Sequence, residues 1–121
     1  MHYSIALTVP AGSTVEAPAT ESVNLPAGII EHTTLIFPPG CSRLVKACIK
    51  DGANQIMPKN AAVKYAEDSY SFEIKEFYIM DVATDITLSA SSVGTSYQHV
   101  ITAHFDVKGL EEMAMARSGY Y

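Results

Sequence analysis

Short runs in which apolar and polar residues alternate are the dominant feature of this chain. In residues 3–9 the apolar positions are Tyr3, Ile5, Leu7 and Val9. Because side chains on a strand point alternately to its two faces, this alternation predicts a half-buried strand. Pro, Gly and Asp-Gly breaks end each run after a few residues. The chain is therefore predicted to consist of short β-strands.

About eight strands are expected within residues 1–108. Their ranges are 3–9, 21–25, 29–37, 44–50, 54–57, 69–80, 84–90 and 96–107. Residues 44–50 and 54–57 are the clearest hairpin, because Asp51-Gly52 is a typical tight turn. Residues 61–68 are ambiguous between a short strand and a turn of helix. Strands that do not alternate with helices indicate an all-β domain, a sandwich or a barrel.

Three of these strands allow predictions of side-chain direction. In 29–37, Ile29 shares a face with Leu35, and both faces are partly apolar, so this strand is central or covered by a partner. In 44–50, the outward face carries Lys46, Cys48 and Lys50 and is expected to be solvated. In 69–80, the alternation of apolar and polar positions is expected to shift by one residue at a β-bulge near Lys75-Glu76. This shift would turn Phe77 and Ile79 inward.

Residues 109–121 differ from the rest of the chain. Residues 110–117 are good helix formers, but two turns of helix are too short to be stable alone. This tail must therefore dock on its own domain or on a neighbour, or stay disordered. We interpret it as an interface arm, because apolar side chains at a free terminus gain only by burial. Its candidate interface residues are Met113, Met115, Tyr120 and Tyr121.

Charge and length narrow the possible classes of protein. The chain has 121 residues, which suits a single domain, and a formal net charge of -5 without a basic stripe, which argues against nucleic-acid binding. Membrane insertion is not expected, because no run approaches about 20 apolar residues. Only 17% of residues are charged, against about a quarter in typical domains. Either another subunit covers part of the surface, or Ser and Thr replace charged residues there.

The first ten residues lack the features of a signal peptide, so we expect synthesis in the cytoplasm. Cys41 and Cys48 are then expected to be free thiols, with a disulfide between them as the alternative.

No catalytic or cofactor motif is present, so we expect neither enzymatic activity nor a cofactor. His99 and His104 fall on opposite faces of one strand and cannot share an ion. A metal site from His32, His99 and Cys48, or a calcium site from Asp81 and Asp85, is conceivable, but the expectation is no metal. Seven tyrosines without tryptophan leave a glycan-binding face as an alternative to ordinary packing.

A resemblance adds to this interpretation. The runs 36–41, Leu44-Val45 and 55–58, within a small β-sandwich, resemble the jelly-roll structural proteins of bacterial and archaeal viruses. The resemblance implies a jelly-roll-like antiparallel sandwich and a role in the virion as a capsid, decoration, vertex or tail subunit. Its implied partners are copies of itself and other virion proteins, with no catalytic residue.

Two other functions stay open. The first is a carbohydrate- or receptor-binding β-sandwich module, which needs an exposed face with coplanar aromatic rings. The second is a small enzyme on a barrel-like scaffold, which needs a cavity where histidines and carboxylates converge.

Overall fold

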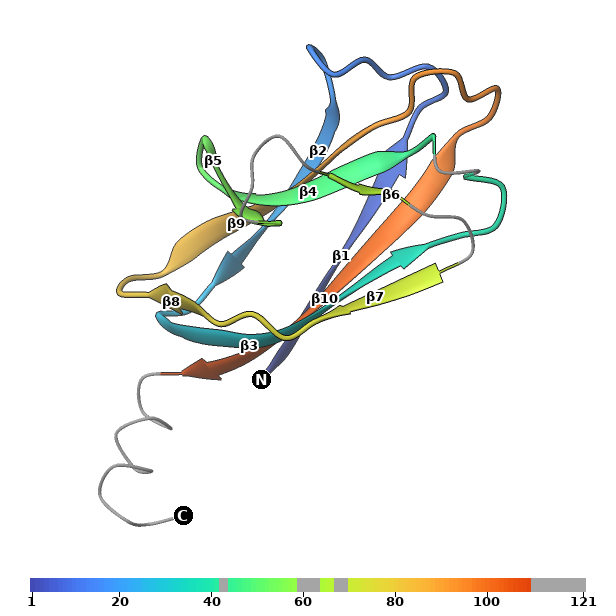
Figure 1. Cartoon of the computed structure of the whole chain (residues 1–121). Helices are drawn as coiled ribbons and strands as arrows, with labels where there is room; N and C mark the ends of the chain where they lie inside the picture. The colour runs from blue at the N-terminus through green and yellow to red at the C-terminus, as the bar shows by residue number, and fades with distance from the viewer. Residues whose placement is uncertain (42–43, 59–63, 67–69, 110–121) are drawn as a thin grey trace, which may run out of the picture.

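The computed structural model describes residues 1–41, 44–58, 64–66 and 70–109. Two five-stranded antiparallel sheets lie face to face, and the described residues contain strands, turns and loops but no helix (Figure 1). The predicted antiparallel sandwich is confirmed. The alternation seen in the sequence gives each sheet one apolar face, and the two apolar faces pack against each other.

The first sheet has the order β1, β10, β3, with β7 and β8 on the far edge of β3. The strands are β1 (His2–Val9), β10 (His99–Gly109), β3 (Gly28–Phe37), β7 (Tyr70–Ile74) and β8 (Tyr78–Met80). The strand β7 pairs with the second half of β3 and β8 pairs with its start. The central position expected for residues 29–37 is therefore correct.

The second sheet has the order β2, β9, β4, with β5 and β6 on the far edge of β4. The strands are β2 (Ala19–Leu25), β9 (Thr84–Ser91), β4 (Lys46–Asp51), β5 (Asn54–Met57) and β6 (Tyr65–Ala66). The predicted hairpin is β4–β5. Its turn places Gly52 at a φ of 60°, a backbone conformation that glycine adopts without a Cβ clash.

The core lies between the sheets and draws on nearly every strand. The largest fully buried side chains include Phe37, Phe105, Leu25, Ile30 and Leu35. Burial of each such side chain stabilises the fold by roughly 1.5–3 kcal/mol. The core therefore needs no cross-link, and Cys41 and Cys48 are both buried free thiols.

Ten strands are present in the described residues, where about eight were expected. The ambiguous segment 61–68 contains β6, and the range 69–80 divides into β7 and β8. The expected phase slip in this range is wrong. Tyr78 and Met80 point toward the core, as Ile74 does. Phe77 and Ile79 therefore point outward, and their side chains are 69% and 66% exposed.

Two further side-chain directions differ from expectation. Ile30, rather than Ile29, is buried, because a bulge at Glu31 shifts the register of β3 against β10. The outward face of β4 is not simply solvated, since Cys48 is only 2% exposed. The strand β10 ends at Gly109, and the predicted interface residues Met113, Met115, Tyr120 and Tyr121 lie outside the described residues.

Candidate functional site

An apolar patch lies on the outer face of the first sheet, away from the core. Ile29 of β3 pairs directly with Ile79 of β8, and Phe77 lies two residues before Ile79 on the same side of the chain. Opposite residues of an antiparallel pair project to one face, so these three side chains share it. We call Ile29, Phe77 and Ile79 the outer apolar patch.

The patch follows from the sequence of the edge strand. The stretch Phe77-Tyr78-Ile79-Met80 is apolar at every position, whereas only one face of a strand can reach the core. Tyr78 and Met80 take the inward positions, which leaves Phe77 and Ile79 in solvent. Single exposed apolar residues are common, but a group of large ones on one face is typical of an interaction surface.

The described chain ends beside this patch. Lys108 of β10 pairs with Ile29, and the next residue, Gly109, pairs with Gly28. Gly28 pairs in turn with Met80 on β8. Residues 110–121, which carry the predicted interface residues, therefore continue from a point one residue away from the patch.

A row of polar side chains lies on the same outer face, farther along β10. His2 of β1 and His32 of β3 flank Asp106 in the pairing register. His2 Nδ1 lies 3.0 Å from Asp106 Oδ1, and His32 Nδ1 lies 3.5 Å from Asp106 Oδ2. His2 Nε2 lies 3.1 Å from His104 Nδ1, and the two rings are stacked. These contacts link three strands at the surface.

This row forms a relay of hydrogen bonds rather than a metal centre. The two ring nitrogens of His2 contact different residues, so the donor atoms do not converge on one point. The described residues contain no group of three or more His, Cys, Asp or Glu side chains able to hold a metal ion. Sequence analysis missed the row because strand pairing, rather than spacing, brings His2, His32 and Asp106 together.

The metal site considered from His32, His99 and Cys48 is not assembled. His99 lies seven residues from Asp106 on β10, so His99 and His32 are about 23 Å apart along the sheet. Cys48 lies on the other sheet, where Lys50 and Lys64 are its charged neighbours. Asp85 Oδ1 accepts a hydrogen bond of 2.8 Å from Asn24 Nδ2, which gives this carboxylate a structural role between β2 and β9.

Aromatic residues gather near the β6 and β7 edges without forming a flat platform. The rings of Tyr65 and Phe72 are inclined by 43°, and those of Tyr70 and Phe72 by 76°. Stacking on a sugar ring needs a flat aromatic face, and two or three coplanar rings make a platform. The arrangement around Phe72 is an edge-to-face packing cluster instead.

Comparisons with known proteins identify the fold. No protein-family model and no curated protein sequence matches the chain. A chain of the cyanophage Pam1 capsid asymmetric unit matches with a TM-score of 0.51 at 13% identity, covering 88% of this chain and 86% of the other. The CBM36-1 domain of a multidomain xylanase from the hindgut metagenome of Trinervitermes trinervoides matches with a TM-score of 0.49 at 9% identity, covering 89% and 100%. A family 35 carbohydrate binding module from Clostridium thermocellum matches with a TM-score of 0.41 at 15% identity, covering 88% and 92%.

At 13% identity, the likeness to the capsid chain shows a shared β-sandwich fold and nothing beyond the fold. In the described residues, no helix has the length and apolarity needed to cross a membrane.

Proposed function

We propose that this chain is a non-enzymatic structural subunit of a viral particle, which assembles with copies of itself and with other virion proteins. The observation that carries the proposal is the outer apolar patch, since Phe77 and Ile79 are 69% and 66% exposed beside the point where residues 110–121 begin. Water-exposed apolar side chains of this size gain free energy when another chain covers them.

The strand order supports a jelly-roll assignment. If β5 with β6, and β7 with β8, are each counted as one interrupted strand, the chain has eight strands in two four-stranded sheets. With these eight strands numbered along the chain, the first sheet has the order first, eighth, third, sixth. The second sheet has the order second, seventh, fourth, fifth. This is the double-sheet arrangement of jelly rolls, a fold used by viral capsid domains. It agrees with the likeness to the phage capsid chain.

A second copy of this chain is the occupant that we propose for the outer apolar patch. Twelve residues follow Gly109, and an extended segment of that length spans about 40 Å. That reach is enough to cross from one sandwich to the next. The side chains offered by the neighbour would be Met113, Met115, Tyr120 and Tyr121, which are apolar or aromatic as the patch requires.

Sedimentation velocity over a range of concentrations tests this proposal. We expect the full chain to form oligomers, and both a chain ending at residue 109 and the double variant Phe77→Ser, Ile79→Ser to be monomers. The control is Val93→Ser, which removes an exposed apolar side chain from a turn outside the patch. A full chain that stays monomeric at the highest concentration, or variants that assemble like it, would overturn the proposal.

A carbohydrate- or receptor-binding module is the alternative. The inclined rings around Phe72 favour assembly over sugar stacking. Glycan-array binding that the Tyr70→Ala variant abolishes, from a chain that stays monomeric, would reverse this preference.

A further inference from the structure

The strand β1 forms one outer edge of the first sheet, and among the described residues only β10 pairs with it. Met1 and Val107 exchange backbone hydrogen bonds of 2.7 and 2.8 Å. Opposed residues of an antiparallel pair alternate between bonded and non-bonded pairs, so the odd-numbered residues of β1 bond to β10. The even-numbered residues therefore direct their backbone N–H and C=O groups to the open edge. These residues are His2, Ser4, Ala6 and Thr8.

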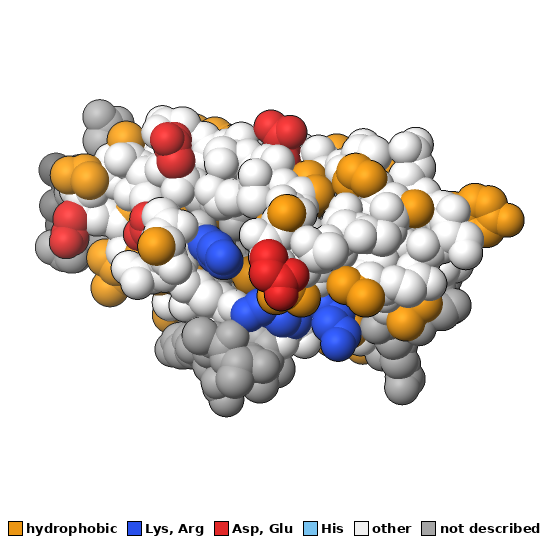
Figure 2. Space-filling view, turned by 90° about the horizontal axis from the view of Figure 1, so that it is seen from above, with side chains coloured by type: hydrophobic (Ala, Val, Ile, Leu, Met, Phe, Trp, Pro, Cys, Tyr) orange, Lys and Arg blue, Asp and Glu red, His pale blue; other side chains and the backbone are white. Residues whose placement is uncertain are grey.

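This open edge lacks the features with which proteins usually prevent edge pairing, namely charged side chains, Pro and interruptions. The strand β1 runs for eight residues without Lys, Arg, Asp, Glu or Pro. The side chains of Ser4, Ala6 and Thr8 are small, uncharged and exposed. Charge is present elsewhere on the surface, since Figure 2 shows a face with both acidic and basic side chains. A second extended strand can therefore approach residues 4–8 without steric or charge repulsion.

The other three edges of the two sheets differ from β1. The opposite edge of the first sheet is divided into β7 and β8, with Lys75 and Glu76 between them. In the second sheet, one edge is divided into β5 and β6, which have four and two residues. The other edge, β2, carries the exposed side chain of Glu21. In the described part of the chain, β1 is thus the one edge that is both uninterrupted and free of these charges.

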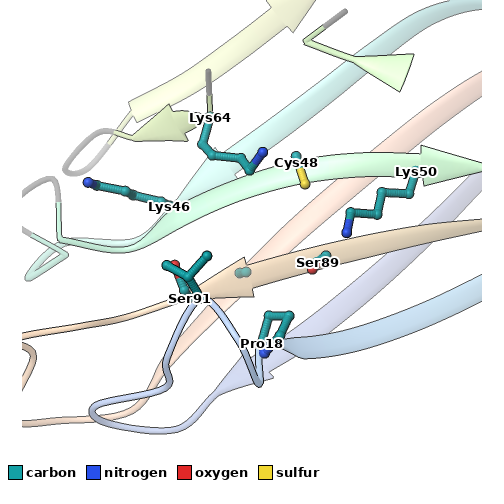
Figure 3. A pocket seen from close by; sticks show the side chains of 9 residues that line it. Pro18, Lys46, Cys48, Lys50, Lys64, Ser89 and Ser91 are labelled. Atoms are coloured by element: carbon teal, nitrogen blue, oxygen red, sulfur yellow. The ribbon is translucent and has the colours of Figure 1, made fainter. Parts of the chain in front are cut away.

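The connection from β1 to β2 is held over the second sheet and does not run along β1. Just after β9, Ser92 N donates a 2.9 Å hydrogen bond to the Ser13 carbonyl oxygen. Val15 and Pro18 then line a cavity of about 150 Å³ beside Cys48, on the outer face of the second sheet (Figure 3). The connection therefore leaves the edge of β1 open.

We infer that β1 pairs with the β1 strand of a second copy of this chain, antiparallel about a two-fold axis at Ile5. In this register Ser4 of one copy faces Ala6 of the other, and His2 faces Thr8. The outward backbone groups of all four residues are then satisfied by about eight interchain hydrogen bonds. A second copy is the occupant because the two-fold axis places outward N–H groups opposite outward C=O groups, and no like charges meet. Since the opposite edge of the sheet is interrupted, this pairing closes at two copies.

The pairing is weak by itself, since it joins backbone and small side chains rather than large apolar ones. We expect a Kd of about 1 mM, so that chains without the outer apolar patch sediment as monomers. Within an assembled particle, the effective concentration of neighbouring copies reaches this range. The β1 edge is independent of the proposed function, because it lies across the first sheet from the outer apolar patch.

Disulfide trapping tests this pairing in the full chain with Phe77→Ser and Ile79→Ser, which remove the outer apolar patch. Copies that carry Ser4→Cys are mixed with copies that carry Ala6→Cys, at concentrations close to the expected Kd, under mild oxidation. Mass spectrometry then separates the mixed disulfide from the two symmetric ones. We expect the mixed disulfide to exceed each symmetric one by at least about fivefold, against about twofold from random encounter, because facing positions are closest.

The matched control is Thr20→Cys mixed with Ser22→Cys, two exposed positions with the same spacing on β2. This pair should give the ratio of random encounter, because the charge of Glu21 lies between the two positions. The native thiols of Cys41 and Cys48 are buried and should not compete.

A second measurement follows the amide chemical shifts of Ser4 and Thr8 in NMR as the protein concentration rises. We expect these shifts to change with concentration, and Ala6→Pro to abolish the change. Proline at position 6 removes an N–H group that points to the open edge and leaves the hydrogen bonds to β10 in place.

The ratio of random encounter at positions 4 and 6, or amide shifts that do not depend on concentration, would overturn the inference. Concentration-dependent shifts that disappear in a chain ending at residue 109 would identify the tail of a neighbour as the occupant, and would also overturn it. An excess of the mixed disulfide would support pairing through β1 even if the outer apolar patch proved not to drive assembly.

Discussion

His2 Nδ1 lies 3.0 Å from Asp106 Oδ1, and the two residues face each other across β1 and β10. The adjacent N-terminal ammonium group of Met1 donates a 2.7 Å hydrogen bond to the Val107 carbonyl oxygen. The first residues of the chain are thus held to the last strand of the first sheet. His32 approaches the other oxygen of Asp106 from β3, at 3.5 Å.

The pKa of Asp106 is lowered, mainly by the hydrogen bond from His2 and less by that from His32. A carboxyl whose pKa is lower in the folded state stabilises the fold above its unfolded pKa, which is about 3.9. This contribution is lost as the pH falls through the lower, folded value. We expect His2→Ala to raise the pKa of Asp106 more than His32→Ala does, as measured by NMR titration of its carboxyl carbon. An unchanged pKa in His2→Ala would contradict this assignment.

Tyr78 and Asp51 connect the two sheets, because the Tyr78 hydroxyl on β8 donates a hydrogen bond to Asp51 Oδ2 on β4. This bond raises the pKa of Tyr78 to about 12, with smaller contributions from burial and from the charge of Asp51. A raised tyrosine pKa stabilises the fold below the unfolded value of about 10, and the effect disappears as the pH rises through the folded value.

Replacement of Tyr78 tests this cross-sheet contact. We expect Tyr78→Phe to lower the free energy of unfolding by about 1 kcal/mol at pH 7 and to remove the highest tyrosine step from an ultraviolet pH titration. Tyr70→Phe is the control, since Tyr70 is 53% exposed and lies outside this contact. Equal effects of the two variants would show that the contact does not stabilise the sandwich.

Phe105 and Phe77 have the same side chain in opposite environments, at 0% and 69% exposure. Phe105→Ala should lower the free energy of unfolding by about 3–5 kcal/mol, because it leaves a cavity in the core. Phe77→Ala should change that of the monomer by less than about 0.5 kcal/mol. Chemical denaturation at concentrations too low for assembly measures both, and a large loss in Phe77→Ala would mean that Phe77 packs within its own chain.

Gly28 allows β3 and β10 to approach closely at the end of the first sheet. Its φ is 156°, and a Cβ at this position would lie 2.2 Å from the Lys108 carbonyl oxygen. Gly28→Ala should therefore cost about 2–4 kcal/mol in thermal unfolding experiments, through strain and a clash with backbone. Gly12→Ala is the matched control, with a φ of 70° and no atom within 4 Å of the added Cβ, and should cost about 1 kcal/mol. A similar loss in both variants would exclude the clash as the cause.

Alternation of apolar residues was enough to predict most strands, because burial on one face depends only on neighbours along the chain. It correctly placed Ile5, Leu7 and Val9 in the core. It failed where both phases of a segment are apolar, as in Phe77-Tyr78-Ile79-Met80. There the pairing of β8 with β3, which is a long-range contact, decides which residues point inward.

The candidate sites were harder to predict for the same reason. The row of His2, His32 and Asp106 exists only because β1, β10 and β3 are neighbours in the sheet. The cavity beside Cys48 needs the connection between β1 and β2 to lie over β4 and β9. The spacing of the residues in the sequence predicts neither which strands are neighbours nor where this connection lies.

Self-association through the outer apolar patch can be measured directly by photo-cross-linking. A benzophenone amino acid replaces Ile79 in the full chain, and copies labelled with 14N and 15N are mixed before irradiation. We expect cross-linked peptides that combine the two isotopes and join position 79 to residues 110–121 or to the patch of a second copy. Two results would contradict assembly through this face. One is that every cross-linked pair carries a single isotope, and the other is that no cross-links form at concentrations of tens of micromolar.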